Sequence, residues 1–384
     1  MQRVQMSTYQ HGFPQVAQAM VSKLVRSSES AVILRVIVIV QFGVVLFGIV
    51  KLNGIGKEKW MISFLRSNGD DDTFNTRLVS EFDLPPWLMQ AAFGRNISYE
   101  RGKKILLPEI NHKRGELCLL VLVISTPKSH GRREIIRQTW TRNKHQNTTL
   151  EGAKHFYDNT KVVFALGRSG NKNLDLFIED EAELYSDIFR GVTLESYRNL
   201  VFKVWDAFRW SIIYQPKYII KVDHDVYVNL PKFFSWIRED NIPHFLYAGY
   251  LHFNAYIYRN NDSAHFVSED EFQGKKFPDY CGGPCYIVSG NLMQEMVKQS
   301  KNVPMFKVED AYTGVVAHTL GVRPLDVGES LVHWNRWSLM ENMKNWTESK
   351  IRDSLCLGDS ANSLMIYQIH DIFTKIYSKT DANT

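Results

Sequence analysis

The chain has little cysteine, no block of basic residues and only one long apolar run. Its 384 residues include four cysteines, and its formal net charge of +5 is spread along the sequence. Because no Lys/Arg cluster is interleaved with aromatic residues, the composition argues against a nucleic-acid partner. No internal repeat or low-complexity tract stands out. A hydrophobic content of 44% is enough for one large domain, or two small ones, with a sizeable core.

The cysteines leave their redox state open. They are Cys118, Cys281, Cys285 and Cys356. Four cysteines permit three complete disulfide pairings, and four buried free thiols are the alternative. The Asn-x-Ser/Thr pattern of glycosylation acceptors occurs at Asn96, Asn147, Asn261 and Asn345. This pattern supports a lumenal location for the bulk of the chain.

The long apolar run, Ala31–Val50, predicts a membrane anchor. It is interrupted only by Arg35 and Gln41. As a helix it would span about 30 Å, the thickness of a bilayer core. A polar segment precedes the run and lysines follow it, so we expect an uncleaved transmembrane signal anchor at 31–50 rather than a cleaved signal peptide. A cytoplasmic tail at 1–30 and a lumenal stem at 51–115 would flank it; a buried core helix is the alternative.

Regular alternation of strands and helices begins near residue 117. Continuous apolar runs predict strands over 117–124, 162–166 and 218–222, and such runs are typical of strands buried on both faces. Helices are predicted over 131–140, 174–185, 197–214 and 311–320. This alternation predicts an α/β fold with an open, mainly parallel sheet flanked by helices.

The most informative stretch is Asp223-His224-Asp225, at the end of the third predicted strand. Alternate side chains of an extended segment point to the same side, so the two carboxylates would project together, about 7 Å apart at Cα. Two hard oxygen ligands without a nearby cysteine suit Mg²⁺ or Mn²⁺ rather than zinc. At the carboxyl end of a strand they would face the crevice in which α/β proteins bind nucleotides. A solvated acidic turn is the alternative.

Two arginines four residues apart, Arg133 and Arg137, lie in the first predicted helix. Their charges repel each other unless an anion lies between them, and a helix that follows a strand favours phosphate at its N-terminus. We therefore expect both arginines to contact a diphosphate. The alternative is that they pair with carboxylates such as Glu134 or Glu183.

Asp310 precedes the last predicted helix. By pattern it is the N-cap of that helix, which is a purely structural role. It is also a candidate general base, because a carboxylate at a helix N-terminus is held ionised and rigid. The two roles can coexist.

Several stretches resemble successive blocks of the β-1,3-galactosyltransferase and β-1,3-N-acetylglucosaminyltransferase family. They are Arg-Arg-Glu-Ile-Ile-Arg-Gln-Thr-Trp (132–140), Glu-Ala-Glu-Leu-Tyr-Ser-Asp-Ile (181–188), Ser-Tyr-Arg-Asn-Leu (196–200), Lys-Val-Asp-His-Asp-Val-Tyr-Val-Asn (221–229), Phe-Pro-Asp-Tyr-Cys-Gly-Gly (277–283) and Glu-Asp-Ala-Tyr-Thr-Gly (309–314). They occur in the family's order and at its spacing. One block alone would be a weak signal; together they are a strong one.

The resemblance implies a GT-A fold, as in glycosyltransferase family 31. The catalytic domain would cover 116–340, with a C-terminal helical extension at 341–384. The resemblance also implies a type II Golgi membrane protein with its catalytic domain in the lumen, a UDP-sugar donor, a glycoprotein or glycolipid glycan acceptor, and Mn²⁺. The oligomeric state stays open, a homodimer included.

The resemblance also assigns roles to single residues. It makes Asp225 a metal ligand, places Asp223 at the ribose or the metal, and makes Asp310 the catalytic base. His333, in Leu-Val-His-Trp, is similar to a late metal ligand of the family, although a lone histidine is often simply packed or exposed.

Three departures from the family's pattern leave the reaction class unchanged, and together they leave the identity of the acceptor open. His224 replaces the middle residue of an acidic triplet and should point away from its neighbours, so the metal site should survive. Cys281-Gly-Gly-Pro-Cys-Tyr286 replaces Cys-Ser-Gly-Gly-Gly-Tyr, and Pro284 should reshape a loop that lines the acceptor cleft. His265-Phe266 stands where the family has a Trp.

The expected activity is that of an inverting hexosyltransferase. Asp310 would deprotonate an acceptor hydroxyl, which attacks the anomeric carbon of a UDP-hexose and displaces UDP. Galactose in β-1,3 linkage is the first choice of sugar and N-acetylglucosamine the second. The competing hypotheses are a catalytically silent relative, acting as a lectin-like module or a chaperone, and a hydrolase of the nucleotide sugar.

Overall fold

The chain forms two units in the computed structural model, Met1–Leu84 and Pro85–Thr384, and each is described by itself. The structure describes the backbone of residues 33–39, 45–52, 59–66, 102–141, 153–239, 241–328, 332–333 and 338–381. It describes side chains for residues 102–141, 153–239, 241–328 and 338–379.

The first unit contains an antiparallel sheet in which β2 (Val45–Leu52) pairs with both β1 (Ile33–Ile39) and β3 (Lys59–Arg66). Strands therefore occupy most of the run at 31–50, where we expected a helix. β-branched residues, which favour strands, make up most of β1. Across the described ranges, no helix is long and apolar enough to cross a membrane. Residues 1–32 and 40–44 lie outside those ranges, and the anchor stays a prediction.

The second unit is built on a seven-stranded sheet. In sheet order its strands are β11 (Leu325–Asp326), β9 (Tyr247–His252), β10 (Tyr280–Ser289), β7 (Tyr218–Asp223), β4 (Leu119–Ile124), β5 (Thr160–Arg168) and β6 (Ile188–Leu194). The strands β7, β4, β5 and β6 pair in parallel, whereas β10 is antiparallel to both β7 and β9. The predicted α/β fold with a mostly parallel sheet is confirmed.

Helices connect the strands. They are α3 (His130–Gln138), α4 (Ala153–Asp158), α5 (Lys172–Tyr185), α6 (Leu200–Ser211), α7 (Leu230–Trp236), α8 (Gly290–Gln299), α9 (Glu309–Thr319), α11 (Leu339–Lys344), α12 (Glu348–Asp353) and α13 (Ser363–Asp381). The predicted strands correspond to β4, β5 and β7, and the predicted helices to α3, α5, α6 and α9, so these predictions are confirmed. After α9, Gly321 has a φ of 73°, a left-handed conformation that glycine adopts without strain.

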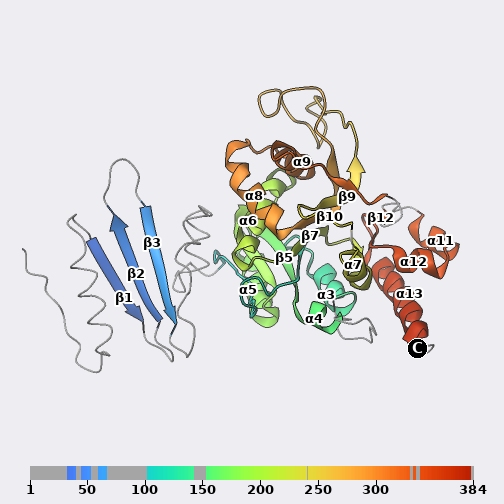
Figure 1. Ribbon diagram of the computed structural model, residues 1–384, viewed down its shortest axis with the longest axis horizontal. Helices are drawn as coiled ribbons and strands as arrows, with labels where there is room; N and C mark the ends of the chain where they lie inside the picture. The colour runs from blue at the N-terminus through green and yellow to red at the C-terminus, as the bar shows by residue number, and fades with distance from the viewer. Residues whose placement is uncertain are drawn as a thin grey trace, which may run out of the picture. The chain divides into compact units, whose positions relative to one another are not determined.

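Both faces of the sheet are covered. Figure 1 shows α6, α8 and α9 on one side of it and α3, α4, α7 and α13 on the other. On the first side the Trp205 ring of α6 meets the Tyr312 ring of α9 at 5.1 Å. On the second, the Phe156 ring of α4 meets the Phe234 ring of α7 at 4.7 Å. Every residue of β4 is buried between these layers, which is why its sequence is a continuous apolar run.

A second, three-stranded sheet joins the C-terminal part to the centre of the unit. Its order is β12 (Val332–His333), β13 (Cys356–Leu357) and β8 (Tyr227–Val228). The Tyr227 ring stacks on the Phe373 ring of α13 at 5.1 Å, and the Tyr377 hydroxyl donates to Asn229 Oδ1 at 3.0 Å. The described part of the segment that we delimited as an extension, 341–384, therefore packs in the core of the second unit.

The segment before β4 also packs on the second unit. Leu106 exchanges two backbone hydrogen bonds with Arg190 of β6, and the Gly102 N–H donates to both carboxylate oxygens of Glu179 at 3.1 Å. The stem delimited at 51–115 thus ends in residues that belong to this unit.

Candidate active site

The acidic pair lies where β7 ends. Asp223 is the last residue of β7, with 36% of its side chain exposed, and Asp225 lies in the turn that follows. Burial and the like charge of Asp223 raise the pKa of Asp225, so the two carboxylates are close enough to repel each other. Since the strand ends at Asp223, the extended geometry assumed from sequence holds only for the first of the two.

His224 is tied to the neighbouring strand. Its Nδ1 lies 3.1 Å from the Ile124 carbonyl oxygen of β4, which also accepts the His224 backbone N–H at 3.1 Å. A carbonyl can only accept, so Nδ1 carries the proton in this contact. Burial, followed by the charge of Arg132, lowers the pKa of His224. The imidazole is therefore neutral at pH 7.

Lys221 meets the acidic residues from inside the sheet. Its Nζ donates to Asp223 Oδ1 at 2.7 Å and to the Gly283 carbonyl oxygen, and it lies 3.6 Å from Glu309 Oε2. Burial favours neutral lysine, but the charges of Asp223, Glu309 and Asp310 outweigh burial, and the pKa of Lys221 lies above its ordinary value. Lys221 is therefore a buried cation.

Asp310 lies inside the first turn of α9. The helix begins at Glu309 and its N-cap is Val308, so the predicted N-cap role of Asp310 is wrong because the helix starts earlier than its apolar pattern. Asp310 Oδ1 accepts its neighbour's backbone N–H, that of Ala311, at 2.9 Å, and Oδ2 accepts the Gly283 N–H at 3.0 Å. Two donors thus orient a partly exposed carboxylate, which suits a general base.

The stretch 281–286, expected to be a loop, lies inside β10. The pairing of β10 with β9 jumps from Cys281↔Leu251 to Tyr286↔Gly249, so the strand bulges between these pairs. Pro284 has no N–H to give to a ladder and is tolerated at such a bulge. The bulge brings Gly283 close to Asp310. A Cβ added at Gly283 would lie only 3.1 Å from Asp310 Oδ2.

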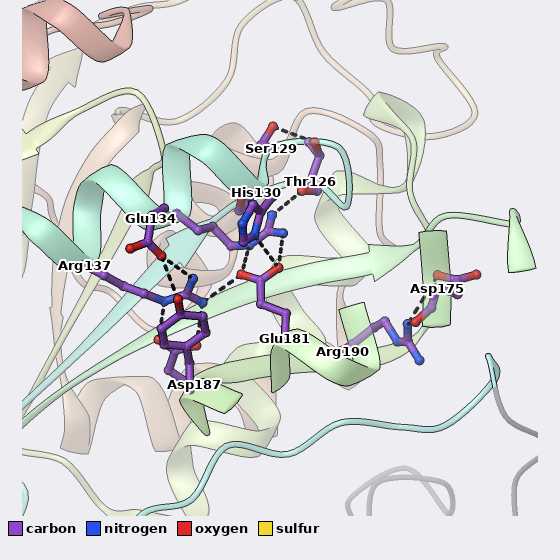
Figure 2. A network of polar contacts seen from close by, with 12 residues as sticks. Thr126, Ser129, His130, Glu134, Arg137, Asp175, Glu181, Asp187 and Arg190 are labelled. Atoms are coloured by element: carbon purple, nitrogen blue, oxygen red, sulfur yellow. Dashed lines mark hydrogen bonds and ion pairs between the residues drawn. The ribbon is translucent and has the colours of Figure 1, made fainter. Parts of the chain in front are cut away.

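Arg133 and Arg137 both form ion pairs with Glu181 of α5, and Figure 2 labels Arg137 and Glu181 in this network. Fully buried Arg133 donates through Nε and Nη2 to the two oxygens of Glu181, at 2.8 and 2.6 Å. Arg137 donates to Glu181 at 2.8 Å and to both oxygens of Asp187, at 2.8 and 2.9 Å. Figure 2 shows His130 and Arg137 turned toward Glu181. This corrects the predicted diphosphate contact: carboxylates occupy both guanidinium groups.

The sequence held a signal for this burial. Arg133 and Arg137 lie on the same helical stripe as Ile136 and Trp140, both buried. Burial disfavours ionised Glu181, but hydrogen bonds and charge from the two arginines outweigh burial and lower the pKa of Glu181 to about 2. The network is therefore a fixed structural element at neutral pH.

The arginine near the acidic pair is Arg132, which is not among the site residues predicted from the sequence. Its Nη1 donates to the Ala361 carbonyl oxygen, and the Ala361 N–H donates to the Asp225 carbonyl oxygen at 3.1 Å. The positive charge of Arg132 also opposes the rise in the pKa of Asp225. Arg132 lies outside the buried stripe of α3 that contains Arg133 and Arg137. This position is the sequence signal that could have distinguished Arg132 from the other two arginines.

Aromatic side chains lie near Asp310. We call Tyr197, Tyr258, His265 and Tyr280 the aromatic cluster. The Tyr197 hydroxyl lies 3.0 Å from His265 Nδ1, and the Tyr258 and His265 rings are 6.0 Å apart. Burial, followed by the charge of Asp310, raises the pKa of Tyr197 and of Tyr280. Tyr258 is 60% exposed, so the cluster offers aromatic surface to solvent beside the carboxylate.

His333 lies in β12, where its backbone pairs with Leu357 of β13. Its side chain is outside the described part of the chain. β13 also pairs with β8, which begins two residues after Asp225. The proposed role of His333 as a metal ligand stays a prediction.

The acidic pair fits a divalent cation. Within the described ranges, no group of three or more His, Cys, Asp or Glu side chains could hold a metal ion by itself. Two carboxylates suffice for a cation that takes its other ligands from a diphosphate and water. Burial, followed by the like charge of Asp223, raises the pKa of Asp225, and such a cation would neutralise the charge of both carboxylates. Asp223 and Asp225 are the side chains that would hold Mn²⁺.

Acidic side chains at the end of a central parallel strand lie where open α/β proteins bind nucleotides. A comparison with protein families makes the class specific. The Galactosyltransferase family model matches residues 131–327, just over half of the chain, and the chain belongs to this family.

Three relatives are named for three different sugars. UDP-GalNAc:beta-1,3-N-acetylgalactosaminyltransferase 1 of Mus musculus is 34% identical over 211 residues, which cover 53% of this chain and 60% of that protein. Beta-1,3-galactosyltransferase 5 of Pan paniscus is 26% identical over 58% of this chain and 71% of that protein. Lactosylceramide 1,3-N-acetyl-beta-D-glucosaminyltransferase A of Danio rerio is 29% identical over 55% and 57%. The chain thus spans about three fifths of the first relative's length.

Among solved structures, the galactosyltransferase LgtC in complex with donor and acceptor sugar analogs aligns with a TM-score of 0.33 and 9% identity, over 67% of this chain and 95% of that one.

Proposed function

We propose that the protein is an inverting β-1,3-glycosyltransferase with a GT-A fold that moves a sugar from a UDP-sugar to a glycan acceptor. One observation carries the proposal: strand β7, the bulge of β10 and the start of α9 bring Asp223, Gly283 and Asp310 together through a chain of hydrogen bonds. This arrangement supports a base at partly exposed Asp310 beside a site for a diphosphate. Family membership supports the same reaction class.

In the proposed reaction, Asp310 accepts the proton of an acceptor hydroxyl. The hydroxyl oxygen forms a bond to the anomeric carbon as the bond from that carbon to the diphosphate oxygen breaks, and UDP departs from the opposite face. The N–H groups of Ala311 and Gly283 hold the Asp310 carboxylate in place during the transfer. A base oriented in this way contributes typically about 10²–10⁴-fold to the rate.

The donor diphosphate would lie between the acidic pair and Arg132. When bound by Asp223 and Asp225, Mn²⁺ supplies the positive charge that stabilises a departing diphosphate. Arg132 adds a guanidinium, which suits phosphate oxygens, and its contact with Ala361 fixes its position.

The acceptor would lie against the aromatic cluster, whose exposed Tyr258 and Tyr197 offer aromatic surface to a sugar. Galactose is the donor sugar that we place first and N-acetylglucosamine second. The names of the relatives add N-acetylgalactosamine to this list.

We also propose that the protein is a type II Golgi membrane protein with its second unit in the lumen. The apolar run Ala31–Val50 supports an anchor. Asn261 and Asn345 are exposed in the structure, as glycosylation acceptors must be, while Asn96 and Asn147 lie outside the described residues. If the proposal holds, an N-glycosidase will increase the gel mobility of the protein from a eukaryotic host. Unchanged mobility would count against a lumenal location.

Mn²⁺ binding tests the donor site without relying on turnover. We expect the electron paramagnetic resonance signal of free Mn²⁺ to fall when UDP and the protein are both present. Asp225→Asn should abolish this effect and Asp270→Asn, a change at an exposed loop carboxylate, should preserve it. An Asp225→Asn variant that still binds Mn²⁺ with wild-type affinity would contradict the assignment of Asp225.

Turnover then tests the reaction class. We expect UDP release from UDP-galactose, UDP-N-acetylglucosamine or UDP-N-acetylgalactosamine to depend on an added glycan acceptor pool. Release that is equally fast without acceptor would indicate hydrolysis. Binding of Mn²⁺ and UDP without any release would indicate the catalytically silent relative.

A further inference from the structure

Lys221 is placed where a lysine is costly. It lies in the middle of β7, the strand between β4 and β10, and is 1% exposed. A buried ammonium must be compensated by charges and hydrogen bonds, because its transfer out of water is strongly unfavourable. An apolar residue would fill the same position at lower cost, so the charge of Lys221 has a role beyond packing.

The ammonium group of Lys221 links three separate elements. It donates to Asp223 on its own strand at 2.7 Å and to the carbonyl oxygen of Gly283 on β10, and it pairs with Glu309 on α9 at 3.6 Å. The ring of Tyr286, its cross-strand neighbour, has its centroid 5.7 Å from Nζ. Lys221 and Asp223 are two positions apart on one strand, so they share a face of the sheet.

The path from Lys221 continues to Asp310. Gly283 gives its carbonyl oxygen to Lys221 and its N–H to Asp310 Oδ2, the latter at 3.0 Å. The bulge of β10 frees both groups for these contacts, because the ladder between β9 and β10 passes from Cys281 directly to Tyr286. The carboxylate at the proposed metal site and the proposed base are thus joined by one ammonium and one glycine.

We propose that Lys221 is a positioning residue that fixes the distance and orientation between Asp223 and Asp310, with Gly283 as the intermediate. This inference rests on the proposed function, because it assigns Lys221 a role in that reaction. Lys221 also competes with a cation for Asp223, since its ammonium occupies one carboxylate oxygen.

The two roles of Lys221 predict effects of opposite sign. Without the ammonium, Asp310 loses the support that reaches it through Gly283, and turnover falls. Asp223 loses a competing positive charge, and Mn²⁺ binds more tightly. A lysine that merely stabilised the fold would, on removal, weaken both properties together.

The test combines two variants of the full chain. In Lys221→Met we expect kcat to fall about a hundredfold, while the affinity for Mn²⁺ in the presence of UDP, measured by electron paramagnetic resonance, rises about threefold to tenfold. In Gly283→Ala the added Cβ, 3.1 Å from Asp310 Oδ2, displaces only the base. Here we expect kcat to fall about tenfold or more with Mn²⁺ affinity unchanged.

Lys161→Met is the matched control. Lys161 is a partly buried lysine of the same sheet, and its Nζ donates to the carbonyl oxygen of Ser186 and to none of the described residues of the proposed site. Lys161→Met should lower the melting temperature without raising the affinity for Mn²⁺. A folded Lys221→Met with wild-type kcat, or with Mn²⁺ affinity and kcat lost in parallel, overturns the inference. If Lys221→Met does not fold, the test rests on Gly283→Ala alone. Wild-type kcat in Gly283→Ala would then overturn the inference. A wild-type protein that binds no Mn²⁺ in the presence of UDP overturns the proposed function itself.

Discussion

Two clusters of charged residues in this protein contain similar side chains, but they differ in the balance of positive and negative charge. Around Glu181, the guanidinium groups of Arg133 and Arg137 face the carboxylates of Glu181 and Asp187, and short hydrogen bonds join them. Around Lys221, one buried ammonium faces Asp223, Glu309 and Asp310, with Asp225 nearby. The first cluster is complete in itself, whereas the second has surplus negative charge. A balanced buried cluster maintains the fold; an unbalanced, partly exposed one indicates where a ligand belongs.

The largest expected effect tests the unbalanced cluster. Asp310→Asn should lower kcat by about 10²–10⁴-fold, or about 3–5 kcal/mol of barrier, because an amide cannot accept the acceptor's proton. It should cost about 1 kcal/mol of stability, since Asn has one acceptor oxygen for the two N–H groups that now bond Asp310. Steady-state kinetics and thermal unfolding measure the two effects separately.

Glu348→Gln is the control for Asp310→Asn. Glu348 is also an acid in the first turn of a helix, but it is exposed and pairs with Lys379. Neighbouring Glu309 cannot serve, because it is buried and bonded to Tyr286 and Thr313. An Asp310→Asn variant with wild-type turnover would mean that the base lies elsewhere and that the clusters differ only in exposure.

Changes in the balanced cluster around Glu181 should alter the stability of the fold. Glu181→Gln removes the charge shared by two buried arginines, and we expect it to lower the free energy of unfolding by about 3–5 kcal/mol. Glu183→Gln, two positions along the same helix but exposed, should change it by less than about 0.5 kcal/mol. Denaturant unfolding of both variants makes the comparison. Equal effects would show that the network does not stabilise the fold.

Acid should reproduce part of that loss in the wild type. The pKa of Glu181 is lowered from 4.5 to about 2 in the folded state, so its contribution is fully present above pH 4.5. That contribution, about 3 kcal/mol, is lost as the pH falls from 4.5 toward 2. Unfolding free energies measured over this range should fall more steeply for the wild type than for Glu181→Gln. Parallel curves would contradict the assignment.

The smallest expected effect concerns Arg132. Arg132→Met should weaken UDP binding about tenfold, or 1.4 kcal/mol, and leave uridine binding unchanged, because only UDP carries the diphosphate. Arg209→Met is the control, since Arg209 pairs with Asp206 of α6. Isothermal titration with both ligands measures the affinities. A parallel loss of uridine affinity would mean that Arg132 only supports the Ala361 segment.

The predictable part of the fold was the part with local signals. β4, β5 and β7 are continuous apolar runs, and a strand buried on both faces requires such a run. β10 was missed because Cys-Gly-Gly-Pro-Cys contains residues typical of turns. Its place beside β7 depends on pairing between residues 63 to 71 positions apart. Local pattern carries no information about such pairing.

The candidate site carried local signals of the same kind. Asp223, Asp225 and Asp310 were selected for their chemical type, and the structure places Asp223 and Asp310 in one hydrogen-bonded path. The arginines were misassigned because charge spacing was weighed above the buried stripe that they share with Ile136 and Trp140. The contact between Arg132 and Ala361 joins residues 229 positions apart, and no local pattern predicts it.

The position of β10 has a consequence for the growing chain. Synthesis reaches residue 223 before residues 280–289 exist, and until β10 arrives β7 has a partner on one side only. A strand with a free edge can pair with another chain, and an inward-pointing charge is one of the devices that discourage this. Lys221 is such a charge. The same ammonium that ends in the centre of the finished sheet would therefore also discourage the unpaired edge of β7 from pairing with another chain until β10 docks.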